Sequence, residues 1–92
     1  MELKEFKKWG DEKYCIEKVK KNGYALRYVK NQTDEICIEA VKQNGDALRY
    51  VKKQNDEICL EAVKENGYAL NYVNDKKLFI KLKMMEKING SN

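Results

Sequence analysis

Three cysteines recur at a spacing of 22 residues in this chain of 92 residues, at Cys15, Cys37 and Cys59. Thiols in such a regular series could bind a soft metal ion or form disulfides. If the spacing reflects stacked helices, however, equivalent positions lie roughly 9–10 Å apart, too far for one ion or one disulfide to join them. Because cysteine also packs as a small apolar residue, we expect three reduced thiols in the core, no metal and no cofactor.

The other reactive side chains do not form a catalytic pattern. The chain has no histidine, and its only hydroxyl side chains besides tyrosines are Thr33 and Ser91, so Ser/His and Cys/His nucleophile arrangements are excluded. Glu17, Glu39 and Glu61 recur in register, whereas a catalytic acid and base need one asymmetric pair with separated pKa values. Repeated carboxylates are more typical of helix caps and solvated faces. We therefore expect a protein that is not an enzyme.

The 22-residue period includes other residue types, which indicates a structural repeat. Apolar residues one and four positions apart predict a helix of about ten residues in each unit. A residue with a short polar side chain precedes each helix and is suited to cap it. The recurring pairs are Asn22-Gly23, Asn44-Gly45 and Asn66-Gly67, the recurring tyrosines are Tyr28, Tyr50 and Tyr72, and the expected caps are Asp11, Thr33 or Asp34, and Asn55 or Asp56.

Each predicted helix ends at an Asn-Gly pair, where we expect the glycine to adopt the left-handed conformation of a C-terminal cap. A second helix of about seven residues follows, and in the middle unit its apolar stripe is Ala47, Leu48 and Val51. Both helices are too short to be stable alone. Stacking of the units must therefore stabilise them.

Two other structures deserve comparison. Asn-Gly is also the strongest signal for a tight β-hairpin, but the residues before Asn44 have helical periodicity rather than alternation. Because 22 is twice 11, one continuous amphipathic helix on a lipid surface is the second alternative. A glycine in every unit argues against such a helix.

The sequence thus predicts an all-α fold, a short α-solenoid of stacked helix-turn-helix repeats in a single domain, 1–92. Terminal units of such stacks differ from the consensus, because one of their faces meets water. In the last segment, Leu78, Phe79 and Leu82 take the positions that Ile58, Cys59 and Ala62 hold in the unit before. The expected parts are an N-terminal cap at 1–10, repeats at 11–32, 33–54 and 55–75, and a longer C-terminal capping helix at 76–92.

The phrase "DEICLEAVKENGYALNYV", from Asp56 to Val73, resembles a family of short helical repeats classed as a domain of unknown function. The family occurs in large DNA viruses, bacteria and some protists. The resemblance covers residues 12–73, and its specific part is the pattern EAVKxNGxALxYV. It implies an all-helical repeat and offers no catalytic residues to transfer.

Some positions vary while the repeat frame stays fixed, and repeat proteins usually carry their recognition chemistry at such positions. Tyrosine and arginine are also the residues most enriched at binding hot spots. We therefore expect a partner-binding face, and neutral drift on a solvated face is the competing interpretation. The candidate residues are Tyr24, Asp46 and Tyr68 in one register and Arg27, Arg49 and Asn71 in another.

The net charge of +4 hides a segregated distribution. Residues 1–33 hold nine Lys/Arg and five Asp/Glu, residues 34–75 hold five and nine, and residues 76–92 hold five and one. Such segregation either solubilises the protein or matches a charge-patterned partner. The alternative function is nucleic-acid binding, provided that folding brings the basic ends together. The lysines for that alternative are Lys7, Lys8, Lys18, Lys20, Lys21, Lys76, Lys77, Lys81 and Lys83.

The most favoured function is a non-catalytic protein-binding module, acting as a stand-alone inhibitor or adaptor. Its partner is another protein, alone or in a nucleoprotein complex, and its oligomeric state stays open. A composition rich in Lys, Asn, Ile and Glu suits an AT-rich phage or viral genome, and a mobile-element inhibitor of a host nuclease is the special case. With an odd cysteine count, a mean hydropathy of -0.82 and no long apolar run, we expect a cytoplasmic protein with no membrane partner.

Overall fold

The computed structural model describes residues 8–90, and side chains only for residues 8–85. The expectations for Lys7 and for most of the N-terminal cap therefore lie outside the described residues. Within 8–90 every regular element is a helix, which excludes the β-hairpin, and the interruptions between elements exclude one continuous helix. The elements are α2 (Glu12–Lys21), η1 (Gly23–Tyr28), α3 (Asp34–Gln43), η2 (Gly45–Tyr50), α4 (Asp56–Glu65), η3 (Gly67–Tyr72) and α5 (Lys76–Gly90).

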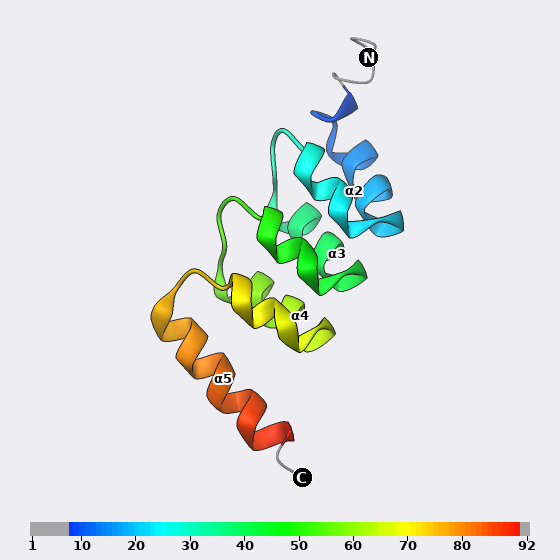
Figure 1. Cartoon of the computed structure of the whole chain (residues 1–92). Coiled ribbons are helices and arrows are strands. Elements are labelled where there is room, and N and C mark those ends of the chain that lie inside the picture. The colour runs from blue at the N-terminus through cyan, green and yellow to red at the C-terminus, as the bar shows by residue number, and fades with distance from the viewer. Residues whose placement is uncertain (1–7, 91–92) are drawn as a thin grey trace.

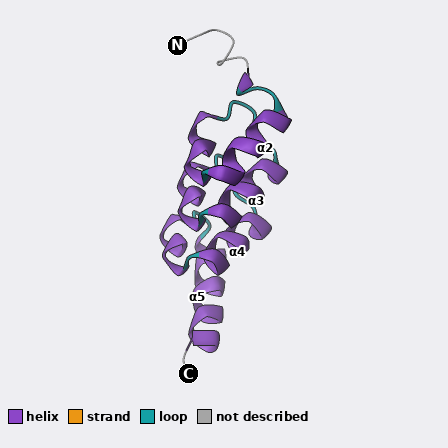
Figure 2. Ribbon diagram, turned by 90° about the vertical axis from the view of Figure 1, so that its right-hand side faces the viewer, coloured by secondary structure: helices purple, strands orange, loops and turns teal. Residues whose placement is uncertain are grey.

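The repeats form two layers that run side by side along the molecule (Figure 2). Helices α2, α3 and α4 stack in one layer, and η1, η2 and η3 stack in the other. The three η elements are 3₁₀-helices of six residues, which confirms a short second helix in each repeat and defines its type. The fully buried core between the layers includes Leu26, Ile36, Leu48 and Ile58, together with the three cysteines, each at most 3% exposed.

The α-helices begin where their caps predict. The side-chain oxygens of Asp11, Thr33 and Asn55 each accept a hydrogen bond from the amide three residues later, at 3.1, 3.2 and 2.8 Å. This bond satisfies one of the amides that a helix leaves unpaired at its first turn. Thr33 and Asn55, rather than the aspartates that follow them, are therefore the caps.

Helices α2, α3 and α4 end at an asparagine, and the expectation of a left-handed glycine was wrong. No described residue has a positive φ. Asn22, Asn44 and Asn66 are extended, with φ of −152°, −154° and −150°. Each side-chain Oδ1 also accepts a hydrogen bond from the amide two residues later, at 2.9–3.0 Å. The asparagine therefore ends one helix and caps the 3₁₀-helix that follows.

The glycine after each asparagine permits close packing between repeats. A methyl group on Gly23 would lie 2.5 Å from the carbonyl oxygen of Ala40, and one on Gly45 would lie 2.5 Å from that of Ala62. Real side chains do not approach so closely. Both alanines are fully buried, so a small residue on each side of the contact sets the distance between successive repeats.

The last helix departs from the stack. Leu78 and Leu82 of α5 are buried, as their alignment with Ile58 and Ala62 predicts. Leu82, however, is much larger than the alanine it replaces, and Gly67 is exposed where the preceding glycines of the stack are buried. Helix α5 accordingly runs more steeply than α3 and α4 and extends away from them (Figure 1), in a molecule that measures 50 × 22 × 19 Å.

Candidate partner-binding surface

The 3₁₀ layer carries a ladder of tyrosine and arginine side chains, which we call the Tyr/Arg face. It consists of Arg27, Tyr28, Arg49, Tyr50, Tyr68, Asn71 and Tyr72, all contributed by η1, η2 and η3. At its centre the guanidinium carbon of Arg49 lies 5.4 Å from the ring centroid of Tyr50 and 5.6 Å from that of Tyr72. Arg49 thus bridges two successive repeats through cation–π contacts and remains exposed.

Arg27 holds the equivalent position one repeat earlier. Its guanidinium lies 4.8 Å from the ring centroid of Tyr28, and its Nη2 donates a hydrogen bond of 2.8 Å to the hydroxyl of the same tyrosine. The Tyr28 ring packs on Trp9, with centroids 5.4 Å apart. Both arginines are therefore held against aromatic rings while their charged groups face water.

Two of the six predicted partner-binding residues take part in packing between repeats. The Tyr24 hydroxyl donates to Oδ2 of Asp46 at 3.4 Å, and Asn66 Nδ2 donates to Oδ1 of the same carboxylate at 3.2 Å. The Tyr24 ring also meets the edge of Tyr50 at 6.0 Å. Tyr24 and Asp46 are therefore half-buried, which gives them a structural role whatever else they contact.

The other four predicted residues are exposed and free to meet a partner. They are Arg27, Arg49, Asn71 and Tyr68, whose side chain is 79% exposed. Tyr68 shares a register with Tyr24 and Asp46, but it belongs to the last repeat. The structure therefore separates the register of Tyr24, Asp46 and Tyr68 into two packing residues and one exposed residue.

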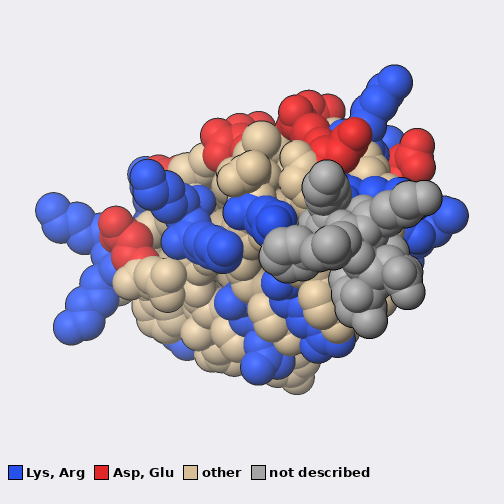
Figure 3. Space-filling model, turned by 90° about the horizontal axis from the view of Figure 1, so that it is seen from above, with Lys and Arg blue, Asp and Glu red and all other residues tan. Residues whose placement is uncertain are grey.

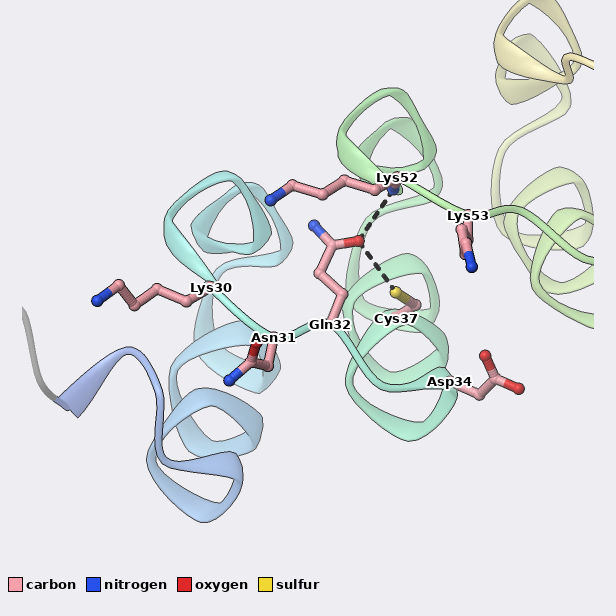
Figure 4. A pocket seen from close by; sticks show the side chains of 7 residues that line it. All are labelled: Lys30, Asn31, Gln32, Asp34, Cys37, Lys52 and Lys53. Atoms are coloured by element: carbon pink, nitrogen blue, oxygen red, sulfur yellow. Dashed lines mark hydrogen bonds between the residues drawn. The ribbon is translucent and has the colours of Figure 1, made fainter.

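Sequence reasoning missed a glutamine that connects consecutive repeats. Gln32 Nε2 donates to the carbonyl oxygen of Tyr50 at 2.9 Å. Its Oε1 accepts from the amide of Lys52 at 2.9 Å and from the thiol of Cys37 at 3.5 Å (Figure 4). One side chain thus satisfies both a donor and an acceptor of the following loop. Its recurrence 22 residues later, at Gln54, was the available signal.

The same connection recurs at both ends of the stack. Gln54 bonds the carbonyl of Tyr72 at 2.7 Å and the amide of Asn74 at 3.0 Å. Just before the first repeat, where Gly10 occupies this register, the carbonyl oxygen of Trp9 accepts from the amide of Lys30 at 3.2 Å and from the Cys15 thiol at 3.2 Å. A main-chain oxygen thus replaces the missing glutamine oxygen.

A cleft of about 400 Å³ opens beside Gln32 between two loops (Figure 4). Its lining comprises Lys30, Asn31, Gln32, Asp34, Cys37, Lys52 and Lys53. The equivalent cleft beside Gln54 is smaller, about 170 Å³, and includes Asp56 and Asp75. The two clefts lie at equivalent positions of successive repeats, but the first is lined by three lysines and one aspartate and the second by two aspartates and no lysine. Their charged residues therefore do not form a repeated site.

The cysteines are buried thiols, as the sequence predicts. Burial, followed by the charge of Asp34, raises the pKa of Cys37 from 9.0 to about 11. Burial, followed by the charges of Asp56 and Asp75, raises the pKa of Cys59 to the same value. A thiol held protonated in this way is a poor metal ligand and a poor nucleophile. Among the residues the structure describes, no three His, Cys, Asp or Glu side chains gather where they could hold a metal ion.

The lysines of the nucleic-acid alternative lie at opposite ends of the stack. Lys8, Lys18, Lys20 and Lys21 flank or belong to α2, whereas Lys76, Lys77, Lys81 and Lys83 belong to α5. Helices α3 and α4, which begin with acidic turns, stand between the two groups. Viewed from above, the end near α2 shows basic side chains across much of the surface and acidic ones gathered mainly along one edge (Figure 3). Folding therefore does not merge the two groups into one basic face.

Across residues 8–90 no helix has the length and apolar character that crossing a membrane requires.

Comparison with known proteins identifies the family. The model of a family described as a domain of unknown function (DUF4116) matches twice, at residues 11–54 and 34–78. The matches overlap, and each spans about two consecutive repeats. A search of the curated proteins and a search of the solved structures each returned no match. Since the two matches together cover most of the chain, this protein belongs to the DUF4116 family.

Proposed function

We propose that this protein is a non-catalytic protein-binding module that contacts its partner through the Tyr/Arg face. The observation that carries the proposal is the position of Arg49, exposed to water and held between the rings of Tyr50 and Tyr72. Arginine and tyrosine are the residues that most often dominate binding energy at protein interfaces. A surface with both types in register across several repeats suits that use.

The stacking of Arg49 prepares it for binding. Immobilising an arginine side chain on binding costs roughly 0.5–1.5 kcal/mol of conformational entropy. This cost is smaller for a side chain that two rings already restrain. Its guanidinium edge stays open to donate paired hydrogen bonds to a carboxylate. Arg27 is restrained by one ring, that of Tyr28, and by its hydrogen bond to the hydroxyl of that tyrosine. The partner that fits best is therefore a protein surface with carboxylates.

We propose an inhibitor or adaptor role, because such a module acts by occupying its partner's surface. The narrower role of a phage or mobile-element inhibitor of a host nuclease rests on composition alone. Nucleic-acid binding through the terminal lysines has no structural observation in its favour, since the two groups stay apart. The nuclease treatment in the following experiment tests nucleic-acid binding.

The test is affinity capture from a lysate of the encoding organism, with and without nuclease treatment. We expect wild type to retain a protein that the double variant Arg27→Ala, Arg49→Ala loses. The matched control is Lys42→Ala, Lys64→Ala, which removes the same charge from exposed positions on the α layer. Equal retention by the double variant would overturn the proposed face. Retention that disappears on nuclease treatment would favour the nucleic-acid alternative.

A further inference from the structure

A groove of about 550 Å³ lies at the end of the third repeat, and we call it the repeat-end groove. Residues Asn66, Gly67, Tyr68, Leu70 and Asn71 line it from the last repeat, and Lys83 lines it from α5. Two of these residues, Tyr68 and Asn71, also belong to the Tyr/Arg face. The groove therefore continues the proposed binding surface to the end of the stack.

The preceding repeats show what this surface accepts. On the first repeat, Gly23 lies against the carbonyl oxygen of Ala40, and its amide donates a hydrogen bond of 2.6 Å to the side-chain oxygen of Gln43. The Tyr24 hydroxyl donates to Asp46, just beyond the same helix. Each glycine surface inside the stack thus receives the C-terminal turn of an α-helix that carries a small residue.

The third repeat has the same surface without that helix. Leu82 replaces the alanine and holds α5 away, so that Gly67 is exposed and Tyr68 is 79% exposed. In the two earlier repeats, a methyl group on the glycine would clash with the next helix, whereas Gly67 faces an open groove. The surface that ordinarily joins one repeat to the next therefore ends in water.

We propose that the repeat-end groove binds the C-terminal turn of an α-helix supplied by the partner protein. The partner places an alanine or glycine against Gly67 and a side-chain amide three residues later, as Ala40 and Gln43 do against Gly23. Lys83 on the opposite wall complements the partial negative charge at the end of that helix. This inference rests on the proposed protein-binding function and names the element that the partner supplies.

The first repeat helix of a second copy does not have the residues that the groove requires. Helix α2 carries Lys18 and Lys21 in the registers of Ala40 and Gln43. A lysine stem in place of the alanine methyl would keep that helix away from Gly67. The helix that fits the groove therefore comes from a different protein.

The test uses a labelled peptide with the sequence of residues 34–46, held helical by a bridge on its exposed side and carrying Cys37→Ser. Titrated into the full chain, it should bind saturably. Gly67→Ala should weaken binding at least about tenfold, since a methyl would meet the helix carbonyl as at Gly23. Tyr68→Ala should weaken it as well. Gly10→Ala and the Ala40→Leu peptide are controls, with unchanged binding expected for the first and lost binding for the second.

The outcomes separate the groove from the face. If the peptide does not bind wild type saturably, or binds wild type and Gly67→Ala equally, the proposal that the repeat-end groove binds a helix is contradicted. Lys42→Ala in the full chain should leave peptide binding unchanged, because Lys42 belongs to α3 and lies outside the groove. If Arg49→Ala loses a captured partner and Gly67→Ala keeps it, the proposed function is supported and helix binding in the repeat-end groove is contradicted. Peptide binding sensitive to Gly67→Ala, with no protein captured by wild type, would overturn the proposed function alone.

Discussion

Gly45 packs so closely against Ala62 that a methyl group on the glycine would lie 2.5 Å from the alanine carbonyl oxygen. The same relation joins Gly23 to Ala40. These contacts set the spacing between repeats and, with it, the distance between the rings and guanidinium groups of the Tyr/Arg face. Packing between glycine and alanine therefore positions the residues that we propose bind the partner.

Replacing Gly45 with alanine should separate two repeats. The added methyl has no room without a shift of the backbone, and overpacking of this kind costs about 1–3 kcal/mol. Gly67→Ala is the matched control, since Gly67 is exposed, and we expect its free energy of unfolding to change by less than about 0.5 kcal/mol. Urea unfolding followed by the helical circular dichroism signal measures both. Equal costs at the two positions would contradict the close-packing account.

Gln32→Leu should loosen the connection between the first and second repeats. It leaves the Lys52 amide and the Tyr50 carbonyl without the bonds that Gln32 supplies. The Tyr50 carbonyl bond is partly buried, and leaving that carbonyl unsatisfied costs roughly 1–3 kcal/mol, whereas the exposed Lys52 amide can bond water instead. Hydrogen exchange at the Lys52 amide should accelerate, whereas the exposed neighbour Asn31→Ala should leave it unchanged. An amide at Lys52 that stays equally protected in Gln32→Leu would show that the glutamine is dispensable.

The buried thiols should make the protein less stable in alkali. The folded-state pKa of Cys37 and of Cys59 is about 11, against 9.0 for the ordinary thiol. Between these values the unfolded thiols lose protons that the folded thiols keep, so the unfolded state binds fewer protons and stability falls as pH rises. The thiol contribution is unchanged well below pH 9.0. Cys37→Ala, Cys59→Ala should reduce this loss of stability, and an identical pH profile for the double variant would contradict the assignment.

The parts of the fold that depend on local interactions could be predicted from the sequence. Helix starts were predictable because caps such as Thr33 bond an amide only three residues away. The repeat period and the burial of the cysteines followed from register and apolar spacing. These features need no knowledge of which repeat touches which.

The incorrect and missing parts depend on contacts between repeats. The role of Gly23 follows from a carbonyl 17 residues later, at Ala40, and a left-handed turn was the simpler local explanation. Gln32 resembles an ordinary loop residue until folding places Tyr50 and Lys52 beside it. Contacts between repeats also decide which of the predicted partner-binding residues are packed and which are exposed. Asp46 lies between Tyr24 and Asn66, whereas Tyr68 meets no following repeat.

The most direct measurement is the affinity of the captured partner for wild type, Arg49→Ala and Arg49→Lys, by titration calorimetry. If the stacked guanidinium is a hot spot, Arg49→Ala should weaken binding by about 2 kcal/mol or more, roughly 30-fold. Arg49→Lys, which keeps the charge and loses the planar group, should recover only part of that loss. The thermal unfolding midpoint should hardly change, since Arg49 is exposed. Wild-type affinity in Arg49→Ala, with the fold intact, would contradict the central claim.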